Sequence, residues 1–218
     1  HTLMHKLFSL FFFLLAIKWV FSQGSFLLVG GGSERNGAAS WSTPAYTLAA
    51  QGKKVAVIGT STGSLASYFK NQCGARYARE FAVASTSLAN SQSLYDTLIQ
   101  YNMIFFRGGD QWEYYNLFRN TLLLQAVKDI FDSGGVVGGT SAGLHILSKV
   151  VYTARNGTVY PYECIENPNN QYVTLEDDFL DFFPGWVFDS HMAERGRFAR
   201  LPGFMAHWKL NKGEEISG

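Results

Sequence analysis

One serine stands between a glycine-rich apolar run and a stretch with helical spacing, in Gly139-Thr140-Ser141-Ala142-Gly143. A strand that turns sharply into a helix holds its middle residue in a strained conformation with the side chain exposed, and only small neighbours fit beside it. The helix N-terminus then directs free N–H groups at the reacting centre, where Ala142 N–H could bind an oxyanion. The pattern predicts Ser141 as a nucleophile. The alternative is a serine that only caps a helix after a glycine turn.

A nucleophilic serine needs a base, and the chain has five histidines. His1 and His5 lie in the N-terminal segment, His145 lies one turn after the serine, and His207 lies inside the last predicted helix. His191 instead follows a predicted strand directly, where a base could reach a serine on a neighbouring strand. We therefore expect His191 to be the base, and a loop histidine with structural hydrogen bonds is the alternative.

The residues leave open which acid orients the histidine. Six carboxylates are candidates by their distance along the chain: Glu163, Glu166, Glu176, Asp177, Asp178 and Asp189. Composition and spacing do not choose among them.

Apolar runs that resemble strands alternate with helical patterns. The predicted strands are 25–32, 54–60, 80–85, 102–111, 134–139 and 185–191. The predicted helices are 43–52, with Thr43 as N-cap, then 63–73, 94–101, 112–131, 141–150 and 192–208, the last interrupted near Pro202. This alternation predicts βαβ units and a mostly parallel sheet with helices on both faces. Ligands bind at the carboxyl ends of such strands, where glycine clusters fall at 30–32, 108–109 and 138–139.

Composition excludes some classes of protein. The 218 residues are 47% hydrophobic and 16% charged with a net charge of +1, which is a globular balance. No basic run exceeds Lys53-Lys54, so nucleic acid is not expected as the main partner. Cys73 and Cys164 lack the spacing of metal ligands, and we expect no metal and no cofactor. The two cysteines could form one disulfide or stay unpaired.

Residues 1–23 differ from the rest of the chain. A basic start at His5-Lys6 precedes an apolar run over 7–17, and small residues follow near Ser22. The run is too short to span a bilayer but fits a signal peptide cleaved before Gln23, with Met4 as the natural start. We expect an exported protein, periplasmic or secreted, with one domain over 24–218 and no membrane span after cleavage. A buried N-terminal helix is the alternative.

Three motifs together resemble a known family. The segments FFRGGDQ, GGVVGGTSAG and FDSHMAERGRFARL resemble the cyanophycinase and aspartyl dipeptidase family of serine peptidases, and within it the exported cyanophycinase-like branch. The resemblance implies a three-layer α/β sandwich with a mostly parallel sheet, akin to class I glutamine amidotransferases. It implies Ser141 as nucleophile, His191 as base and Glu163 as the acid. The family continues past Gly218 in further strands, which we expect to be missing here.

The resemblance also implies a substrate site. The Gly108-Gly109 backbone would complete the oxyanion hole with Ala142. The residues that would line or shape the substrate pocket are Gln111, Asp189, Arg195, Arg197 and Arg200. If the three arginines share one helix, Arg197 and Arg200 lie on the same face of that helix and Arg195 points elsewhere. The implied activity is hydrolysis of aspartyl-containing peptides, such as cyanophycin or related β-Asp-Arg material, through an acyl-enzyme. The expected partner is a peptide substrate, and a homodimer is left open.

The chain departs from the family pattern at three positions. Ser190 stands where cyanophycinases usually carry glutamine, Met192 replaces an aromatic residue, and His145 replaces a small one. Two other functions are compatible with the motifs. An α/β-hydrolase esterase shares the G-x-S-x-G pattern, and a non-catalytic module could bind phosphate at Gly30–Gly32.

Overall fold

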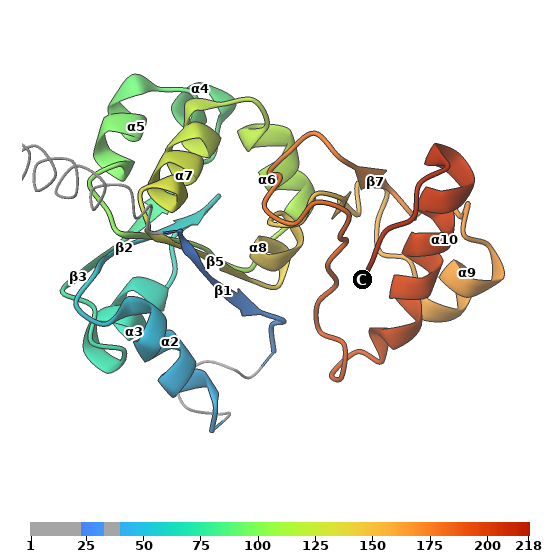
Figure 1. The fold of residues 1–218 in the computed structure, drawn as a ribbon, viewed down its shortest axis with the longest axis horizontal. Coiled ribbons are helices and arrows are strands. Elements are labelled where there is room, and N and C mark those ends of the chain that lie inside the picture. The colour runs from blue at the N-terminus through green and yellow to red at the C-terminus, as the bar shows by residue number, and fades with distance from the viewer. Residues whose placement is uncertain (1–22, 33–39) are drawn as a thin grey trace, which may run out of the picture.

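Five parallel strands form the central sheet. The computed structural model describes residues 23–32 and 40–218. The strands are β1 (Ser25–Val29), β2 (Lys54–Gly59), β3 (Tyr77–Ala82), β4 (Met103–Phe106) and β5 (Val136–Thr140), in the order β1-β5-β4-β2-β3 (Figure 1). All four strand pairs are parallel. The predicted parallel sheet is therefore confirmed, although β3 begins three residues earlier than expected.

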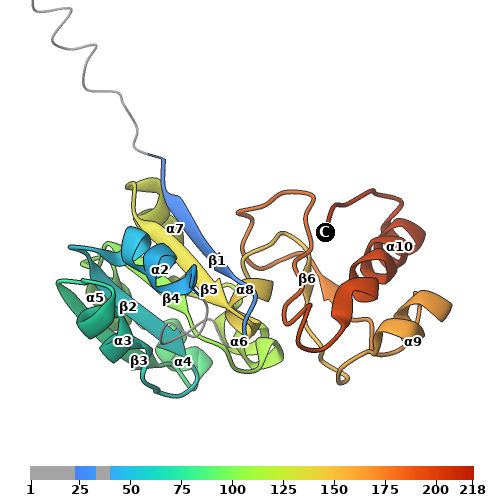
Figure 2. The same cartoon turned by 90° about the horizontal axis from the view of Figure 1, so that it is seen from below.

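Both faces of the sheet are buried under helices, as Figures 1 and 2 show. One face is covered by α2 (Ser42–Ala50) and α3 (Leu65–Gln72). The other is covered by α4 (Thr86–Ala89), α5 (Gln92–Leu98), α6 (Gln111–Phe118), α7 (Leu122–Asp132) and α8 (Ala142–His145). From Val55 to Ile58, successive side chains of β2 alternate between these faces, and all four are apolar because neither face meets water. The expected three-layer α/β sandwich is confirmed.

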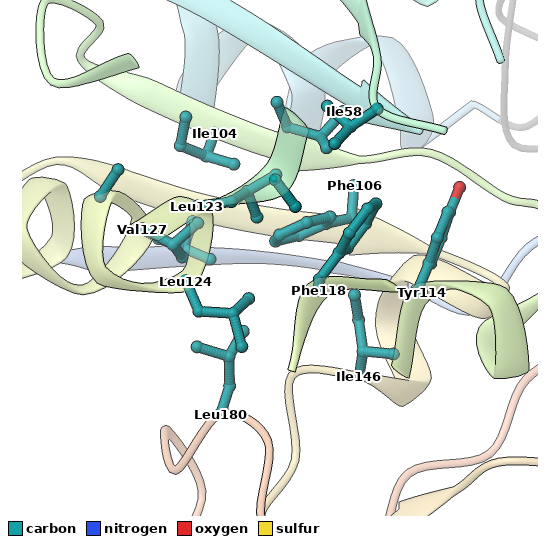
Figure 3. Packing of buried hydrophobic residues seen from close by; sticks show 14 of the residues in the cluster. Ile58, Ile104, Phe106, Tyr114, Phe118, Leu123, Leu124, Val127, Ile146 and Leu180 are labelled. Atoms are coloured by element: carbon teal, nitrogen blue, oxygen red, sulfur yellow. The ribbon is translucent and has the colours of Figure 1, made fainter. Parts of the chain in front are cut away.

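Phe106 shows how the layer on the second face is packed. It is fully buried among Ile58, Phe118 and Ile146, which come from a strand and from two segments far apart in sequence (Figure 3). Because Phe106 is the last residue of β4, this core anchors the end of the strand from which the Arg107–Gly109 loop departs. The loop beside Ser141 therefore rests on a closely packed support.

A second lobe follows the sheet in the chain and lies beside it (Figures 1 and 2). It contains the two-stranded antiparallel pair β6 (Val151–Tyr152) and β7 (Leu175–Glu176), with α9 (Pro161–Glu166), the 3-10 helix η2 (Arg197–Ala199) and α10 (Arg200–Lys212). Its own core includes Tyr152, Phe204 and Trp208. The second lobe thus has a small core of its own.

Several predicted element boundaries were wrong. The 112–131 segment contains two helices, since Asn120 adopts a positive φ of 57° between α6 and α7. The helix expected over 141–150 ends at His145. The strand expected over 185–191 is reduced to isolated bridges at Trp186 and Val187.

Helix caps also differ from expectation. Helix α2 has Trp41 rather than Thr43 at its N-cap. Helix α10 is not interrupted at Pro202, because this proline lies in the first turn, where its missing N–H has no intrahelical acceptor to lose.

The cysteines and the N-terminus complete the comparison. Cys73 and Cys164 are both buried and free, so the unpaired alternative holds. The predicted signal peptide, which ends before Gln23, lies outside the described residues and stays a prediction. Within 23–32 and 40–218, we find no helix long and apolar enough to cross a membrane.

Candidate active site

Ser141 occupies a sharp, strained turn between β5 and α8. Its backbone has φ 54° and ψ −118°, a conformation that costs a non-glycine residue about 1–3 kcal/mol. A Cβ on Gly139 would lie 2.1 Å from the carbonyl oxygen of Gly143, and a Cβ on Gly143 would lie 2.2 Å from that of Phe106. Both glycines are therefore required by close backbone contacts, as the G-x-S-x-G pattern predicted.

His191 meets this serine from the second lobe. Its Nε2 lies 2.8 Å from Ser141 Oγ, although the two residues are 50 positions apart. The His191 backbone also has a positive φ, 55°, and its N–H donates to Gly30 O at 2.9 Å. A Cβ on Gly31 would lie 2.6 Å from the imidazole Nε2, so the ring packs directly on this glycine. The Gly30–Gly31 turn thus supports the histidine, and the expected pairing of Ser141 with His191 is present.

The groups predicted to stabilise an oxyanion surround Ser141. Ala142 is the first residue of α8, so its N–H has no acceptor within that helix. Gly108 faces the serine, since a Cβ there would lie 3.4 Å from Ser141 Cβ. The next residue, Gly109, lines the neighbouring cavity. Both glycines thus lie near the serine, and the part of these backbone groups in binding an oxyanion stays a prediction.

Tyr114 supports the Arg107–Gly109 loop and was missed in the sequence. Its hydroxyl donates to Arg107 O at 3.0 Å and approaches Gly109, where a Cβ would lie 3.0 Å away. The side chain is 1% exposed, and burial raises the pKa of its phenol far above the usual value of 10. Tyr114 is therefore a neutral hydrogen-bond donor that holds the loop. Its spacing on a helix made it resemble an ordinary core residue.

Two cavities open on either side of Ser141. The smaller, of about 240 Å³, contains the serine and the histidine, and its lining is Gly31, Gly32, Leu65, Arg107, Gly108, Thr140, Ser141 and His191. The larger, of about 390 Å³, also contains Ser141, and its walls include Gln111, Arg195, Arg197 and Arg200. A substrate bound across the serine could therefore extend into both.

Asp189 and Arg200 form a buried ion pair rather than an open substrate contact. Arg200 Nε donates to Asp189 Oδ2 at 2.8 Å, and a second nitrogen of the guanidinium binds the other carboxylate oxygen. The two side chains are 1% and 0% exposed. Each of the two side chains is satisfied by the other, and Arg200 also lines the larger cavity. Their predicted part in substrate binding stays a prediction.

Arg195, Arg197 and Gln111 line the larger cavity as predicted. The three arginines do not share one helix: Arg195 lies in a turn, Arg197 begins η2, and Arg200 begins α10. Arg195 consequently faces the same cavity instead of pointing elsewhere. Arg197 Nη1 donates to Ser190 O at 3.3 Å, and burial lowers the pKa of its guanidinium, as does the nearby Arg200.

Two departures from the family pattern contact each other beneath the site. His145 Nε2 lies 3.0 Å from Ser190 Oγ and 3.6 Å from Asp189 Oδ1. The pKa of His145 is lowered to about 4, chiefly by burial and also by Arg200 and Arg197, whereas Asp189 acts in the opposite direction. His145 is thus a buried, neutral histidine, which agrees with its exclusion as the base. His207 is also structural, because its Nδ1 lies 2.8 Å from Pro168 O.

Glu163 has a structural contact of its own. Its Oε2 accepts from Tyr160 N at 2.9 Å in a capping box at the start of α9. Both views place α9 at the outer end of the second lobe, away from α8 (Figures 1 and 2). The contacts in the described ranges do not bring Glu163 to His191. Glu194, which was not among the six candidates for the acid, lies beside Gly32, next to the glycine that supports the histidine.

The comparisons with known proteins agree on one group. No protein-family model matches the chain. Cyanophycinases from Synechococcus elongatus and Thermosynechococcus vestitus are each 29% identical over 129 residues, which are 59% of this chain. The chain covers 38% of the length of these relatives. This chain is cyanophycinase-like.

Solved structures extend the likeness of the cyanophycinase-like chain to its fold. A peptidase from an acI-B1 Actinobacterium superposes with a TM-score of 0.59 at 19% identity, covering 85% of this chain and 76% of that one. A putative peptidase E protein from Listeria monocytogenes has a TM-score of 0.50 at 16% identity, covering 78% and 83%. The chain thus shares the α/β sandwich fold of these two structures.

Proposed function

We propose that this protein is a serine-type peptidase in which Ser141 is the nucleophile and His191 the general base. The observation that carries the proposal is the 2.8 Å contact between Ser141 Oγ and His191 Nε2, made by a serine in a strained strand-to-helix turn. Strain is retained at functional sites because it positions reacting groups before the substrate arrives. The nucleophile and base are thus within hydrogen-bond reach of each other.

The reaction follows from this arrangement. Ser141 Oγ attacks the carbonyl carbon of the scissile bond while its proton passes to His191 Nε2. The resulting oxyanion faces the N–H of Ala142 and the Gly108–Gly109 backbone, and these donors offset its charge. His191 then gives the proton to the leaving amine, the C–N bond breaks, and an ester joins Ser141 to the acyl group. Water attacks this ester with the same base, which releases the acid and restores the serine.

Aspartyl-containing peptides are the proposed substrates. Arg195 and Arg197 project into the larger cavity, where a guanidinium can bind a carboxylate through two parallel hydrogen bonds. The net charge of +1 argues against a general attraction for anions, so a preference would arise within the cavity. Cyanophycin is one candidate, since the matched relatives bear the name cyanophycinase.

The test combines labelling with product analysis on the full chain. A fluorophosphonate should label the wild-type protein at Ser141, whereas Ser141→Ala should not label and Ser190→Ala, a nearby serine change, should. Turnover of aspartyl peptides should fall about 10⁴- to 10⁶-fold in Ser141→Ala and similarly in His191→Ala, because the two act as one unit. A residual rate within tenfold of wild type would exclude Ser141.

Mass spectrometry separates the remaining functions. Cyanophycin and a panel of α- and β-linked aspartyl peptides are incubated with the protein beside simple carboxylic esters. Cleavage of esters alone would favour an esterase. Measurable nucleotide binding without labelling of Ser141 would favour a non-catalytic module. Such a module is disfavoured by the Gly30–Gly32 turn, whose glycines accommodate His191 and Glu194.

A further inference from the structure

Arg107 brings a positive charge to the smaller cavity beside the nucleophile. The residue directly follows β4, and its backbone N–H donates to Ile58 O at 2.9 Å, which continues the sheet pairing. Its side chain lines the 240 Å³ cavity together with Ser141 and His191. This cavity is distinct from the one that contains Arg195 and Arg197.

The position of the guanidinium depends on two glycines. A Cβ on Gly59 would lie 2.5 Å from Arg107 Cδ, and a Cβ on Gly63 would lie 2.8 Å from the Cζ and both terminal nitrogens. The stem and the head of the arginine therefore lie flat against bare backbone. The head is also held by one hydrogen bond, from Nη1 to Ser61 O at 2.9 Å. A side chain at either glycine would displace it.

Within the part of the chain that the structure describes, 23–32 and 40–218, Arg107 forms no ion pair with a carboxylate. Five other arginine and lysine side chains there do form one. The carboxylates of the same region bind elsewhere: Glu80 accepts from Gly63 N and Ala66 N, and Glu113 accepts from Thr60 Oγ1. Guanidinium has five N–H donors, and the described contacts of Arg107 use one. Several donors are thus available to a ligand.

We infer that Arg107 makes the smaller cavity an anion-binding subsite, which accepts a carboxylate on the side of Ser141 opposite Arg195 and Arg197. The inference rests on the proposed function and deepens it. A substrate that spans both cavities would carry an acidic group on each side of the scissile bond. A lysine or arginine side chain would be repelled from the Arg107 cavity, so acidic peptides are preferred over cationic ones there.

The experiment uses the peptide Ala-Asp-Asp-Ala and the versions in which either or both Asp residues are replaced by Asn. Binding is measured by calorimetry on the full chain with Ser141→Ala, and hydrolysis is measured with Ser141 intact. Replacement of the Asp that faces Arg107 should weaken binding about 10- to 100-fold, in the range for a charge-assisted hydrogen bond. In Arg107→Gln the same replacement should change binding less than threefold. The Asp at the other position should respond to Arg197→Gln instead.

Two further variants separate anion binding from a structural role. Gly63→Ala keeps Arg107 but displaces its head, and should reduce the Asp-over-Asn ratio as Arg107→Gln does. Arg76→Gln makes the same change of charge near the start of β3, at the edge of the sheet far from Ser141. It should leave every Asp-over-Asn ratio unchanged. An Asp-over-Asn ratio that survives both Arg107→Gln and Gly63→Ala overturns the inference.

The outcomes also distinguish this inference from the proposed function. Hydrolysis with ratios unaffected by Arg107→Gln removes the subsite and keeps the peptidase. Binding ratios that depend on Arg107, without hydrolysis of any peptide by the Ser141 protein, keep the subsite and remove the peptidase. Absence of both binding and hydrolysis overturns both.

Discussion

At the residue scale, the site depends on side chains whose charge is set by burial. His191 reaches a serine Oγ, while His145, one turn beyond that serine, is enclosed by Ser190, Asp189 and the two nearby arginines. Two histidines so close in space therefore have different tasks. The His191 ring lies beside the proposed nucleophile, and the His145 ring beneath it is a neutral structural group.

The buried histidine predicts a pH dependence of stability. The pKa of His145 is about 4 in the folded protein and about 6.5 when unfolded, so the unfolded state binds more protons between these values. The contribution of His145 to the free energy of unfolding is fully present above pH 6.5. It is lost as the pH falls towards 4, and the loss amounts to up to about 3 kcal/mol. Denaturant unfolding of wild type and His145→Gln should show a steeper loss for wild type in this window. Parallel curves would contradict the prediction. The charged groups that face the ring are Asp189, Arg197 and Arg200, and they are unchanged in the variant.

Glu163 gives a second prediction at this scale. Because its carboxylate caps α9, Glu163→Ala should lower the free energy of unfolding by about 0.5–2 kcal/mol and reduce kcat less than tenfold. The resemblance to the family predicts instead that it orients His191. Unfolding and kcat are measured side by side for Glu163→Ala and Glu194→Ala. A loss of kcat above about 10³-fold with stability unchanged would assign Glu163 as the acid.

At the element scale, the turn between β5 and α8 has no room for additional atoms. Gly143→Ala would place a methyl group 2.2 Å from Phe106 O, and a strand-end carbonyl in a packed core cannot move away. We expect the free energy of unfolding to fall by about 1–3 kcal/mol, as for overpacking, and kcat to fall because α8 shifts relative to the Gly108–Gly109 loop. Chemical denaturation and steady-state kinetics measure these two effects.

Gly30→Ala is the matched control for this change. It adds the same methyl group in the neighbouring loop, where no heavy atom of residues 23–32 and 40–218 lies within 4 Å, and the backbone φ lies outside the left-handed region. Its stability should stay within about 0.5 kcal/mol of wild type. Equal effects of the two variants would show that the G-x-S-x-G glycines are not needed for space.

At the scale of the whole molecule, His191 belongs to a chain segment that returns from the second lobe to the sheet. The buried Asp189–Arg200 pair fixes that segment to the start of α10, and Arg200 Nη1 also donates to Val159 O at 3.4 Å. The ion pair therefore links the position of the base to the packing of the second lobe.

Breaking this pair should destabilise the protein strongly. Arg200→Met leaves Asp189 buried without its partner, and we expect a loss of about 3–5 kcal/mol in the free energy of unfolding. Arg155→Met is the control, since the Arg155–Glu176 pair is partly exposed and should cost less than about 1 kcal/mol. The double variant Asp189→Leu/Arg200→Met should recover part of the loss. A loss under 1 kcal/mol in Arg200→Met would show that the pair does not fix the His191 segment to the start of α10.

The sequence by itself determined the layered sheet and the serine turn, because both depend on local patterns. Apolar runs that end in glycine and alternate with helical patterns can be buried only as parallel strands. Gly139 and Gly143 flank a serine at the spacing that a strand-to-helix turn requires. Only the tertiary structure decided which charged groups reach the site. The partner of Arg200 is 11 residues away and the partner of Ser141 is 50 away, and no periodicity records such contacts. The same reason explains why Arg107 and Arg200 have different surroundings. The guanidinium of Arg107 lies on glycines from another loop, whereas that of Arg200 is enclosed with Asp189. Both are arginines in apolar surroundings by sequence, and the packing of distant segments alone gives one a cavity and the other a buried partner.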